Sequence, residues 1–409
     1  MATVSTIATI PKARAGQRNL ALRRLAARSA ITAGAMAAAA LFLPASLASW
    51  AADDHPRFAA SIAPWDAAAA SDAAAAIPGD PRKGEIRALV TKSLGRDVTQ
   101  VNAIELRALY LALSGKTAEA RHLFELSNRL SRRSLATRLW LIQDAVDRGN
   151  VGEALHNFDI ALRTTTDAQP ILFPVLTRAS ADPRLTIALA RTLDRPSDWR
   201  LMFVDWVLSN APDVAPVAQV VARMRDDRFI VGNGLDQQLI NRMVSSNEFD
   251  QAKMLNQRFG HKAAGIADPN FGDLSAHYPF GWGLVSNGSI GAERAFSGST
   301  TMLTYRAAPA NSGQVAAQLL ALKEGNYVLS TKSAATAIGA APYWSISCGE
   351  LQNRELARLD QPMKADARAE VAFTVPRGCL GQWLTLRIRP AADSSLQSGA
   401  IAFVSVSAR

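Results

Sequence analysis

The chain has 409 residues, which is too long for one ordinary core and enough for two or three domains. It is 48% hydrophobic and 20% charged, a composition that favours folding over disorder. The net charge is +10, but six basic residues and no acid fall within residues 1–29, so the remainder carries only +4. The sequence has no basic stripe with interleaved aromatic residues, and we therefore expect no nucleic-acid partner.

The N-terminal segment predicts export from the cytoplasm. Residues 1–29 are predicted to be a basic cytoplasmic tail, and residues 30–52 form an uncharged apolar segment. Within it, Ile31–Leu43 followed by small residues fits a cleaved signal peptide. The whole segment equally reaches the roughly 20 residues of a single-pass anchor. Because the positive flank stays inside, we expect an inner-membrane protein with a periplasmic C-terminal region, or a soluble periplasmic protein after cleavage.

Residues 53–84 are rich in Ala, Asp and Pro. They contain the breaker Pro78–Pro81, which reads PGDP. We predict a linker here, with room for one degenerate helix around Trp65.

Residues 85–265 show apolar residues at helical spacing, and one pattern recurs with an offset of 34 residues. The repeated positions are Gly115, Glu119, Ala120, His122 and Phe124, which recur as Gly149, Glu153, Ala154, His156 and Phe158. A period of 34 is typical of a helix–turn–helix solenoid unit, which buries its apolar face only by stacking on its neighbours. The glycine of each copy lies where one helix must turn into the next.

These residues resemble the tetratricopeptide repeat (TPR) family. Its pattern has a Gly that ends the first helix, a small residue early in the second helix, and an aromatic residue four positions later. Gly115, Ala120 and Phe124 fit this pattern, as do their counterparts 34 residues later. A poorer third match has Asn247 at the Gly position and Ala252 at the small position. The resemblance implies a TPR-like α-solenoid that packs through these positions and docks a protein partner.

The sequence contains little that indicates a catalytic or metal-binding site. His122 and His156 align, but repeat-equivalent positions lie a full unit apart, and no acid or Cys completes a site, so we expect no metal and no cofactor. No nucleophile elbow, phosphate loop or metal-binding helix motif is present, so we expect no enzymatic activity. Because paired carboxylates assemble in space, a glycan-active hydrolase remains an alternative, with Glu350, Glu355 and Asp360 as the nearest candidates.

The beginning of the C-terminal region is aromatic and then rich in glycine. Tyr278, Phe280 and Trp282 form a cluster that we expect to anchor an entry strand in the core. The following segment, 283–291, has the sequence GLVSNGSIG and is predicted to be a loop.

Residues 270–409 contain short alternating runs separated by turns, which predict an antiparallel β-sandwich with a jelly-roll-like arrangement. The predicted strands are Thr300–Arg306, Gln314–Leu322, Asn326–Lys332, Pro342–Cys348, Ala369–Val375, Gln382–Arg389 and Gly399–Ser407, with Glu355–Leu359 as an eighth. The segments QLLALKEGNYVLS, YWSISC and FTVPRGCLGQWLTLRI resemble a β-sandwich of the carbohydrate-binding-module type, which implies glycan binding.

The two cysteines, Cys348 and Cys379, both lie in this region. An even pair in an exported domain predicts one disulfide. The alternative is two separate buried thiols.

Strand alternation separates inward from outward side chains. Trp344 shares its face with apolar residues and is predicted to be core, whereas Tyr343 and Trp383 share theirs with polar residues and are predicted to face outward. Flat aromatic faces dock sugar rings, so Tyr343 and Trp383 are our glycan-binding candidates. Alternatively, both cover a sheet edge or pack on the helical domain. A bulge near Gly381 would turn Trp383 inward.

The sequence thus predicts an α-then-β multidomain chain: a membrane segment, a TPR-like solenoid and a β-sandwich. We expect a non-enzymatic exported scaffold whose repeats dock a protein and whose sandwich binds a glycan. By resemblance, anchored repeat proteins of this kind fit surface-polysaccharide assembly or export. The rival hypothesis is a purely structural protein whose sandwich contacts only other proteins.

Overall fold

The structure is a computed structural model that describes residues 46–409 apart from short gaps. The gaps are residues 227, 262–264, 274, 276, 299, 350–353 and 391–395. The described residues divide into two compact units, with the boundary between Thr164 and Thr165. The predicted tail and most of the predicted membrane segment, residues 1–45, lie outside the described residues. Within the described part, no helix is long and apolar enough to cross a bilayer.

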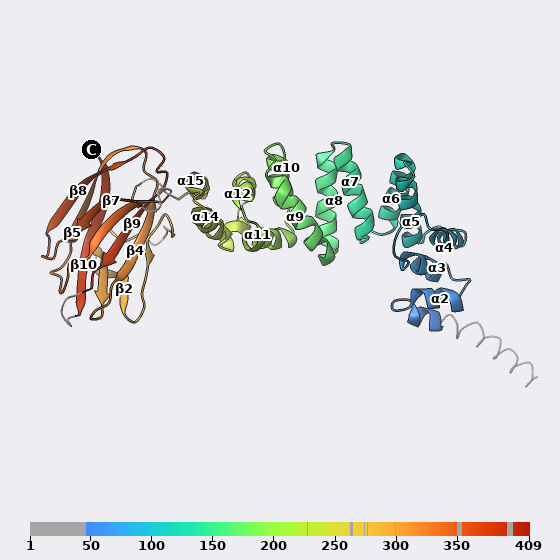
Figure 1. The fold of residues 1–409 in the computed structure, drawn as a ribbon, viewed down its shortest axis with the longest axis horizontal. Helices are drawn as coiled ribbons and strands as arrows, with labels where there is room; N and C mark the ends of the chain where they lie inside the picture. The colour runs from blue at the N-terminus through green and yellow to red at the C-terminus, as the bar shows by residue number, and fades with distance from the viewer. Residues whose placement is uncertain are drawn as a thin grey trace, which may run out of the picture. The chain divides into compact units, whose positions relative to one another are not determined.

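The first unit is helical (Figure 1). Its helices are α2 (Pro56–Ile62), α3 (Ala67–Ala75), α4 (Gly84–Leu94), α5 (Val101–Leu113), α6 (Thr117–Leu130), α7 (Leu135–Asp147) and α8 (Val151–Thr164). Helices α5 and α6 pack as one hairpin, and α7 and α8 pack as the next. Each of the two sequence copies with the 34-residue offset therefore spans a hairpin turn and the second helix of its hairpin.

The linker predicted for residues 53–84 is not what the structure shows, because helices α2 and α3 lie there. Alanine has the highest helix propensity, and its small side chain lets helices approach closely. Ala59, Ala63 and Ala69 are buried together with Ala48 and Ala51, which belong to the predicted membrane segment. These alanines replace the larger apolar residues by which the sequence pattern would have revealed the packed face.

The same hydrogen bond closes the turn of both repeated hairpins. The backbone is left-handed at the turn, with φ of +77° at Gly115 and +70° at Gly149. In each case the next residue donates its amide to the carbonyl five positions back, at 2.9 and 2.8 Å. Asn247, at the Gly position of the third match, has φ of +64° and is followed by the same bond at 2.9 Å. This Schellman arrangement favours Gly and tolerates Asn.

The small and aromatic repeat positions lie in the helical core. Ala120 and Phe124 of the first copy are fully buried, and Ala154 and Phe158 of the second are also buried. The Phe124 ring stacks on Trp140 of α7, with 4.4 Å between ring centroids. The first hairpin therefore shares its core with the second, as stacked repeats require.

The second unit begins with further helices. They are α9 (Gln169–Ser180), α10 (Thr186–Leu193), α11 (Trp199–Asn210), α12 (Ala215–Ala222), α13 (Arg228–Gly232), α14 (Leu235–Ser245) and α15 (Phe249–Arg258), after a short 3₁₀ turn at Thr166–Ala168. Helices α14 and α15 form the hairpin that turns at Asn247, and Ala252 on α15 is fully buried.

The remainder of the second unit is an antiparallel two-sheet β-sandwich (Figure 1). The strands are β1 (Gly283–Leu284), β2 (Ile290–Ser297), β3 (Thr300–Ala307), β4 (Gly313–Leu320), β5 (Gly325–Ser333), β6 (Tyr343–Cys348), β7 (Arg354–Asp360), β8 (Arg368–Val375), β9 (Gln382–Ile388) and β10 (Gln397–Ala408). One sheet has the order β1-β4-β9-β6-β7, which we call sheet A, and the other has the order β2-β3-β10-β5-β8, which we call sheet B.

All eight predicted strands are present, and two further strands were missed. The prediction of a loop at 283–291 is wrong at its ends, because β1 occupies Gly283–Leu284 and β2 begins at Ile290. A two-residue strand is too short to show alternation. Strand β2 pairs with β3 in a regular register from Ile290 to Ser297, although glycine and charged residues dilute its apolar pattern.

The sandwich core is formed by the facing sides of the two sheets. Trp344 is fully buried, as predicted, and its ring lies 5.7 Å from that of Trp282. The Trp344 indole nitrogen donates to the side-chain oxygen of Gln361 at 3.0 Å, and Thr331 of sheet B donates to the same oxygen at 2.8 Å. The buried Gln361 amide in turn donates to Ser333 at 2.8 Å. This network satisfies the polar atoms that the packed core would otherwise leave unpaired.

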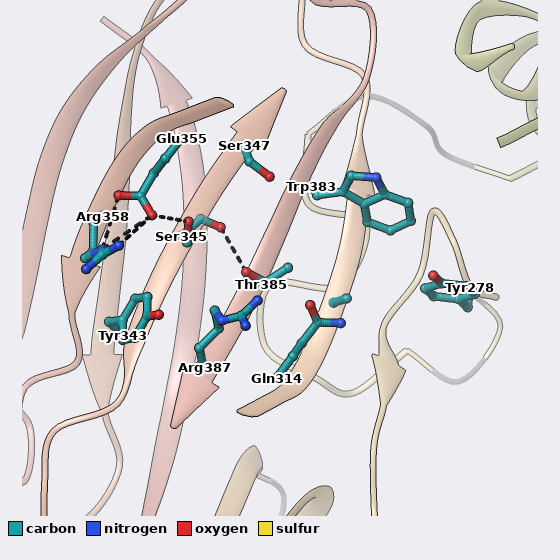
Figure 2. A pocket seen from close by; sticks show the side chains of 11 residues that line it. Tyr278, Gln314, Tyr343, Ser345, Ser347, Glu355, Arg358, Trp383, Thr385 and Arg387 are labelled. Atoms are coloured by element: carbon teal, nitrogen blue, oxygen red, sulfur yellow. Dashed lines mark hydrogen bonds and ion pairs between the residues drawn. The ribbon is translucent and has the colours of Figure 1, made fainter. Parts of the chain in front are cut away.

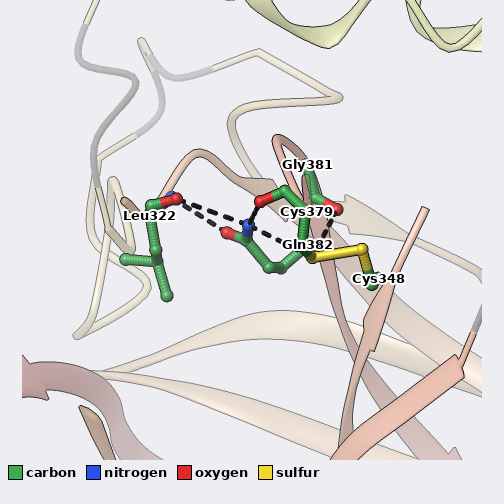
Figure 3. The surroundings of a disulfide bond; sticks show 5 residues. All are labelled: Leu322, Cys348, Cys379, Gly381 and Gln382. Atoms are coloured by element: carbon green, nitrogen blue, oxygen red, sulfur yellow. Dashed lines mark hydrogen bonds between the residues drawn. A yellow bond between two sulfur atoms is a disulfide. The ribbon is translucent and has the colours of Figure 1, made fainter. Parts of the chain in front are cut away.

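Cys348 and Cys379 form a disulfide, which confirms the prediction (Figure 3). Beside it, the fully buried Gln382 side chain donates to the Cys379 carbonyl at 2.7 Å and accepts from the Leu322 amide at 2.9 Å. Gln382 therefore holds the loop after β4 against the loop before β9.

The disulfide end of the sandwich contacts helix α15. Phe249, the first residue of α15, lies against the backbones of Gly349 and Gly381. A Cβ atom at either glycine would approach the ring to within 2.6 Å, a distance that requires a shift. Gly381 therefore serves this contact and introduces no bulge. Strand β9 pairs with β6 without interruption from Gln382 to Arg387.

Candidate functional site

A cavity of about 500 Å³ opens on the outer face of sheet A (Figure 2). Its lining comes from strands β4, β6, β7 and β9 and from the segment before β1. The lining residues are Tyr278, Gln314, Ala317, Tyr343, Ser345, Ser347, Glu355, Arg358, Trp383, Thr385 and Arg387.

Strand alternation places the central side chains of the cavity. Along β9, the residues Leu384 and Leu386 are buried, so Trp383, Thr385 and Arg387 lie on the opposite face. This is the orientation predicted for Trp383.

The same alternation turns three residues of β6 outward. Tyr343, Ser345 and Ser347 stand opposite Arg387, Thr385 and Trp383 respectively in the β6–β9 register. Residues facing each other across neighbouring strands lie within contact range. A row of polar side chains therefore forms the floor of the cavity, and an aromatic residue lies near each end.

Trp383 forms an aromatic pair with Tyr278. The ring centroids are 5.9 Å apart and the planes are inclined by 27°. Tyr278 covers Gly283 of β1 so closely that a Cβ atom at this position would lie 2.5 Å from the ring, and the ring would have to shift. Partial burial raises the pKa of Tyr278, so its hydroxyl stays protonated at neutral pH. The assignment of the whole 278–282 cluster to the core is thus wrong for Tyr278, whereas Phe280 and Trp282 are buried.

Tyr343 lies at the other end of the cavity and is surrounded by cations. The guanidinium carbons of Arg358 and Arg389 are each 4.6 Å from the centre of its ring. Such cation–π contacts occupy the aromatic surface that a sugar would need. The geometry therefore favours Trp383 and Tyr278 over Tyr343 as a stacking surface.

Glu355 is the carboxylate of the cavity. It forms an ion pair with Arg358 at 3.0 Å and accepts a hydrogen bond from the Ser345 hydroxyl at 2.8 Å (Figure 2). Burial by itself would raise the pKa of Glu355. The hydrogen bonds from Arg358 and Ser345 outweigh that effect, so its pKa is lowered.

Of the three hydrolase candidates, the structure describes Glu355 and Asp360, and each of these is paired with an arginine. Glu350 lies outside the described residues. Asp360 is paired with Arg389 at 2.6 Å and does not line the cavity. A glycosidase general acid needs a raised pKa, whereas that of Glu355 is lowered. Among the described residues, no group of three or more His, Cys, Asp or Glu is placed to hold a metal ion.

The remaining cavity residues differ in how far the sequence could reveal them. Ser345, Ser347 and Thr385 share the predicted outer face of their strands with Tyr343 and Trp383, so alternation alone places them correctly. Tyr278 comes from a segment without a strand pattern. Strand β7 reaches the cavity with Glu355 and Arg358 on the same side because its pairing with β6 shifts between Ile346 and Ser347.

Comparisons with models of protein families and with curated proteins find no match for this chain. Solved structures that are similar to part of it include the enzymatically active domain of tailspike protein 4 of bacteriophage CBA120. That match has 12% identity and a TM-score of 0.26, and it covers 34% of this chain and 20% of the other. The chain thus spans about one fifth of that tailspike structure.

Two carbohydrate-binding modules are similar over a comparable share of the chain. A structure of CBM4 matches at 16% identity and a TM-score of 0.27, covering 35% of this chain and 99% of the module. TmCBM61, in complex with beta-1,4-galactotriose, matches at 11% identity and a TM-score of 0.25, covering 36% of this chain and all of the module.

Proposed function

We propose that the cavity on sheet A binds a glycan and that the chain is a non-enzymatic scaffold. The observation that carries the proposal is the pair of aromatic rings, Trp383 and Tyr278, at the edge of a cavity with a polar floor. An aromatic face accepts the C–H face of a sugar ring, and convergent hydroxyl, amide and charged groups orient its hydroxyls. The partial exposure of Trp383 leaves part of its ring for such a contact.

The test is glycan-array binding by the full chain and by its Trp383→Ala variant. We expect Trp383→Ala to weaken binding at least about 30-fold, as removal of a central aromatic anchor does. The cost in folding stability should stay near about 1 kcal/mol, because Trp383 is only partly buried and loses one aromatic neighbour.

The matched control is Phe296→Ala. Phe296 is an exposed aromatic residue on strand β2 of sheet B. Its removal should leave both binding and stability unchanged. Glycan binding that survives Trp383→Ala would contradict the proposal, and so would a Trp383→Ala protein that fails to fold.

We further propose that the helical hairpins dock a protein partner. This rests on the repeated turns at Gly115, Gly149 and Asn247 and on the core shared by the first two hairpins. Stacked helical repeats create extended concave surfaces that bind partners. With the glycan site, they fit a scaffold in surface-polysaccharide assembly or export.

We also propose that the C-terminal region is exported, either anchored in the inner membrane or released into the periplasm. The disulfide supports this, because disulfides persist in oxidising compartments. A reporter that is active only in the cytoplasm, fused after Arg409, should be silent. Strong reporter activity would overturn the export proposal.

A further inference from the structure

Among the described residues that line the cavity, positive charges exceed negative charges by one. Among its lining residues, one carboxylate, Glu355, accompanies two guanidinium groups, Arg358 and Arg387. Glu355 forms an ion pair with Arg358, and Arg387 acts on Glu355 only through the weaker attraction of opposite charges without a direct contact. The neighbouring Arg389 forms an ion pair with Asp360. Arg387 is exposed and forms no ion pair or side-chain hydrogen bond within the described part of the chain.

The position of Arg387 is also specific. It stands on β9 between Tyr343 of β6 and Gln314 of β4, which are its cross-strand neighbours. Figure 2 shows Gln314 beside Arg387. The Gln314 side chain likewise has no hydrogen bond among the described residues, so its amide group can donate beside the guanidinium.

The distance between the two ends of the cavity sets the size of the ligand. Trp383 and Arg387 are four residues apart on one strand, which corresponds to about 13 Å along β9. This value is the spacing of the two backbone positions. A chain of several sugars that runs along β9 from the stacked ring spans it and can present an acidic group to Arg387.

We infer that the ligand is an acidic oligosaccharide or polysaccharide: a sugar stacks on Trp383 and Tyr278, and a carboxylate or sulfate substituent on another sugar pairs with Arg387. The inference rests on the proposed glycan-binding function and names its ligand class. A guanidinium presents two parallel N–H donors to two oxygens of such a group, and Gln314 adds a neutral donor. The pairing of Arg358 and Arg389 within the protein leaves Arg387 to recognise the ligand.

The experiment uses the full chain and glycans that differ only in charge. Polygalacturonate, alginate and hyaluronan are each compared with their carboxyl-reduced forms, and dextran sulfate is compared with dextran. We expect at least one charged member to bind about 10–100-fold more tightly than its neutral counterpart, the usual value of a charge-assisted hydrogen-bonded pair. This preference should shrink as salt is raised.

The variants assign the preference to one side chain. Arg387→Gln should abolish it, and Arg387→Lys should retain a part, because an ammonium keeps the charge but loses the paired donors. Arg377→Gln is the matched control, because Arg377 is an exposed residue in the turn before β9 and does not line the cavity. It should change nothing. Melting curves confirm that each variant is folded.

The outcomes separate this inference from the proposed function. Tight binding of neutral glycans that depends on Trp383, without preference for charge, overturns the inference and leaves the function standing. A charge preference that survives Arg387→Gln also overturns the inference. An Arg387-dependent preference for dextran sulfate alone assigns the substituent as sulfate, and one for a uronate assigns it as carboxylate. Failure to bind any of these glycans counts against both.

Discussion

The same strand alternation places the side chains on the outer faces of both sheets, but the charged side chains of the two faces have different surroundings. On sheet B, Lys332 is paired with Asp366 at 2.6 Å, and Ser330 donates to Glu370 at 3.0 Å. On sheet A, the face is hollowed into the cavity, and Arg387 has no ion-pair partner among the described residues. Arg368 of β8 has no ion pair among the described residues, and its guanidinium carbon lies 5.4 Å from the centre of the Phe403 ring.

The comparison shows where to look for function in a sandwich of this kind. A solvated face needs only polar side chains, and neighbouring opposite charges arise there at little cost. A binding face retains groups that the protein itself does not satisfy, such as a partly exposed aromatic surface and a free guanidinium. Sheet A has both within one cavity.

The largest effect should come from the inward side of sheet A. Trp344→Ala removes a fully buried indole and its hydrogen bond to Gln361. We expect a loss of about 3–5 kcal/mol of unfolding free energy in chemical denaturation, because the cavity left behind cannot collapse fully. A much smaller loss would mean that the Trp344 side of the sheet is not a packed core.

Loss of the disulfide should lower the free energy of unfolding almost as much as Trp344→Ala does. Replacing Cys348 and Cys379 by serine opens a loop with a sequence separation of 31 residues. The chain-entropy model predicts a loss of about 3–4 kcal/mol, measured by denaturation of the double variant against the oxidised protein. The control is the parent protein under reducing conditions, which should match the double variant. Two alkylatable thiols in the native oxidised protein would contradict the pairing.

Breaking a charge pair on sheet B should have a small effect. Lys332→Gln removes the ion pair with the exposed Asp366. We expect a change of about 0.2–1 kcal/mol in stability, the usual range for a surface pair. Glycan binding should be unaffected, in contrast to Arg387→Gln on sheet A. A loss of binding in Lys332→Gln would break the distinction between the two faces.

The smallest effect concerns pH. The pKa of Glu355 lies below its ordinary value of 4.5 in the folded protein. Its ionised form therefore contributes stability that is present above pH 4.5 and lost as pH falls through the lower folded pKa. We expect the difference in melting temperature between the parent and Glu355→Gln to shrink as pH drops below 4.5. A difference that is constant across this range would show that the pair with Arg358 does not stabilise the fold.

The sequence predicted the elements far better than it predicted the site. Eight of the strands, the outward orientation of Trp383 and the burial of Trp344 follow from period-2 alternation, which is a local property of each strand. The disulfide follows from an even cysteine pair in a region predicted to be exported. The left-handed turns at Gly115 and Gly149 follow from the 34-residue repeat.

The sequence-based prediction failed for elements whose packing leaves no recognisable pattern of large apolar residues. The alanines of α2 and α3 bury their small side chains without a recognisable apolar stripe. Strand β1 is too short to alternate, and it is a strand because it pairs with β4.

By itself, the sequence determined the two repeated helical hairpins, eight of the strands and the polar faces of β6 and β9, because neighbouring side chains follow the period of the backbone. Only the tertiary structure decided that Tyr278 lies beside Trp383 and that Arg358 and Arg389 surround Tyr343. It also decided that Glu355 neutralises Arg358 and leaves Arg387 free of an ion pair within the described residues. These choices depend on contacts between segments far apart in the chain. Charge compensation is a property of distances in space, which strand periodicity does not encode.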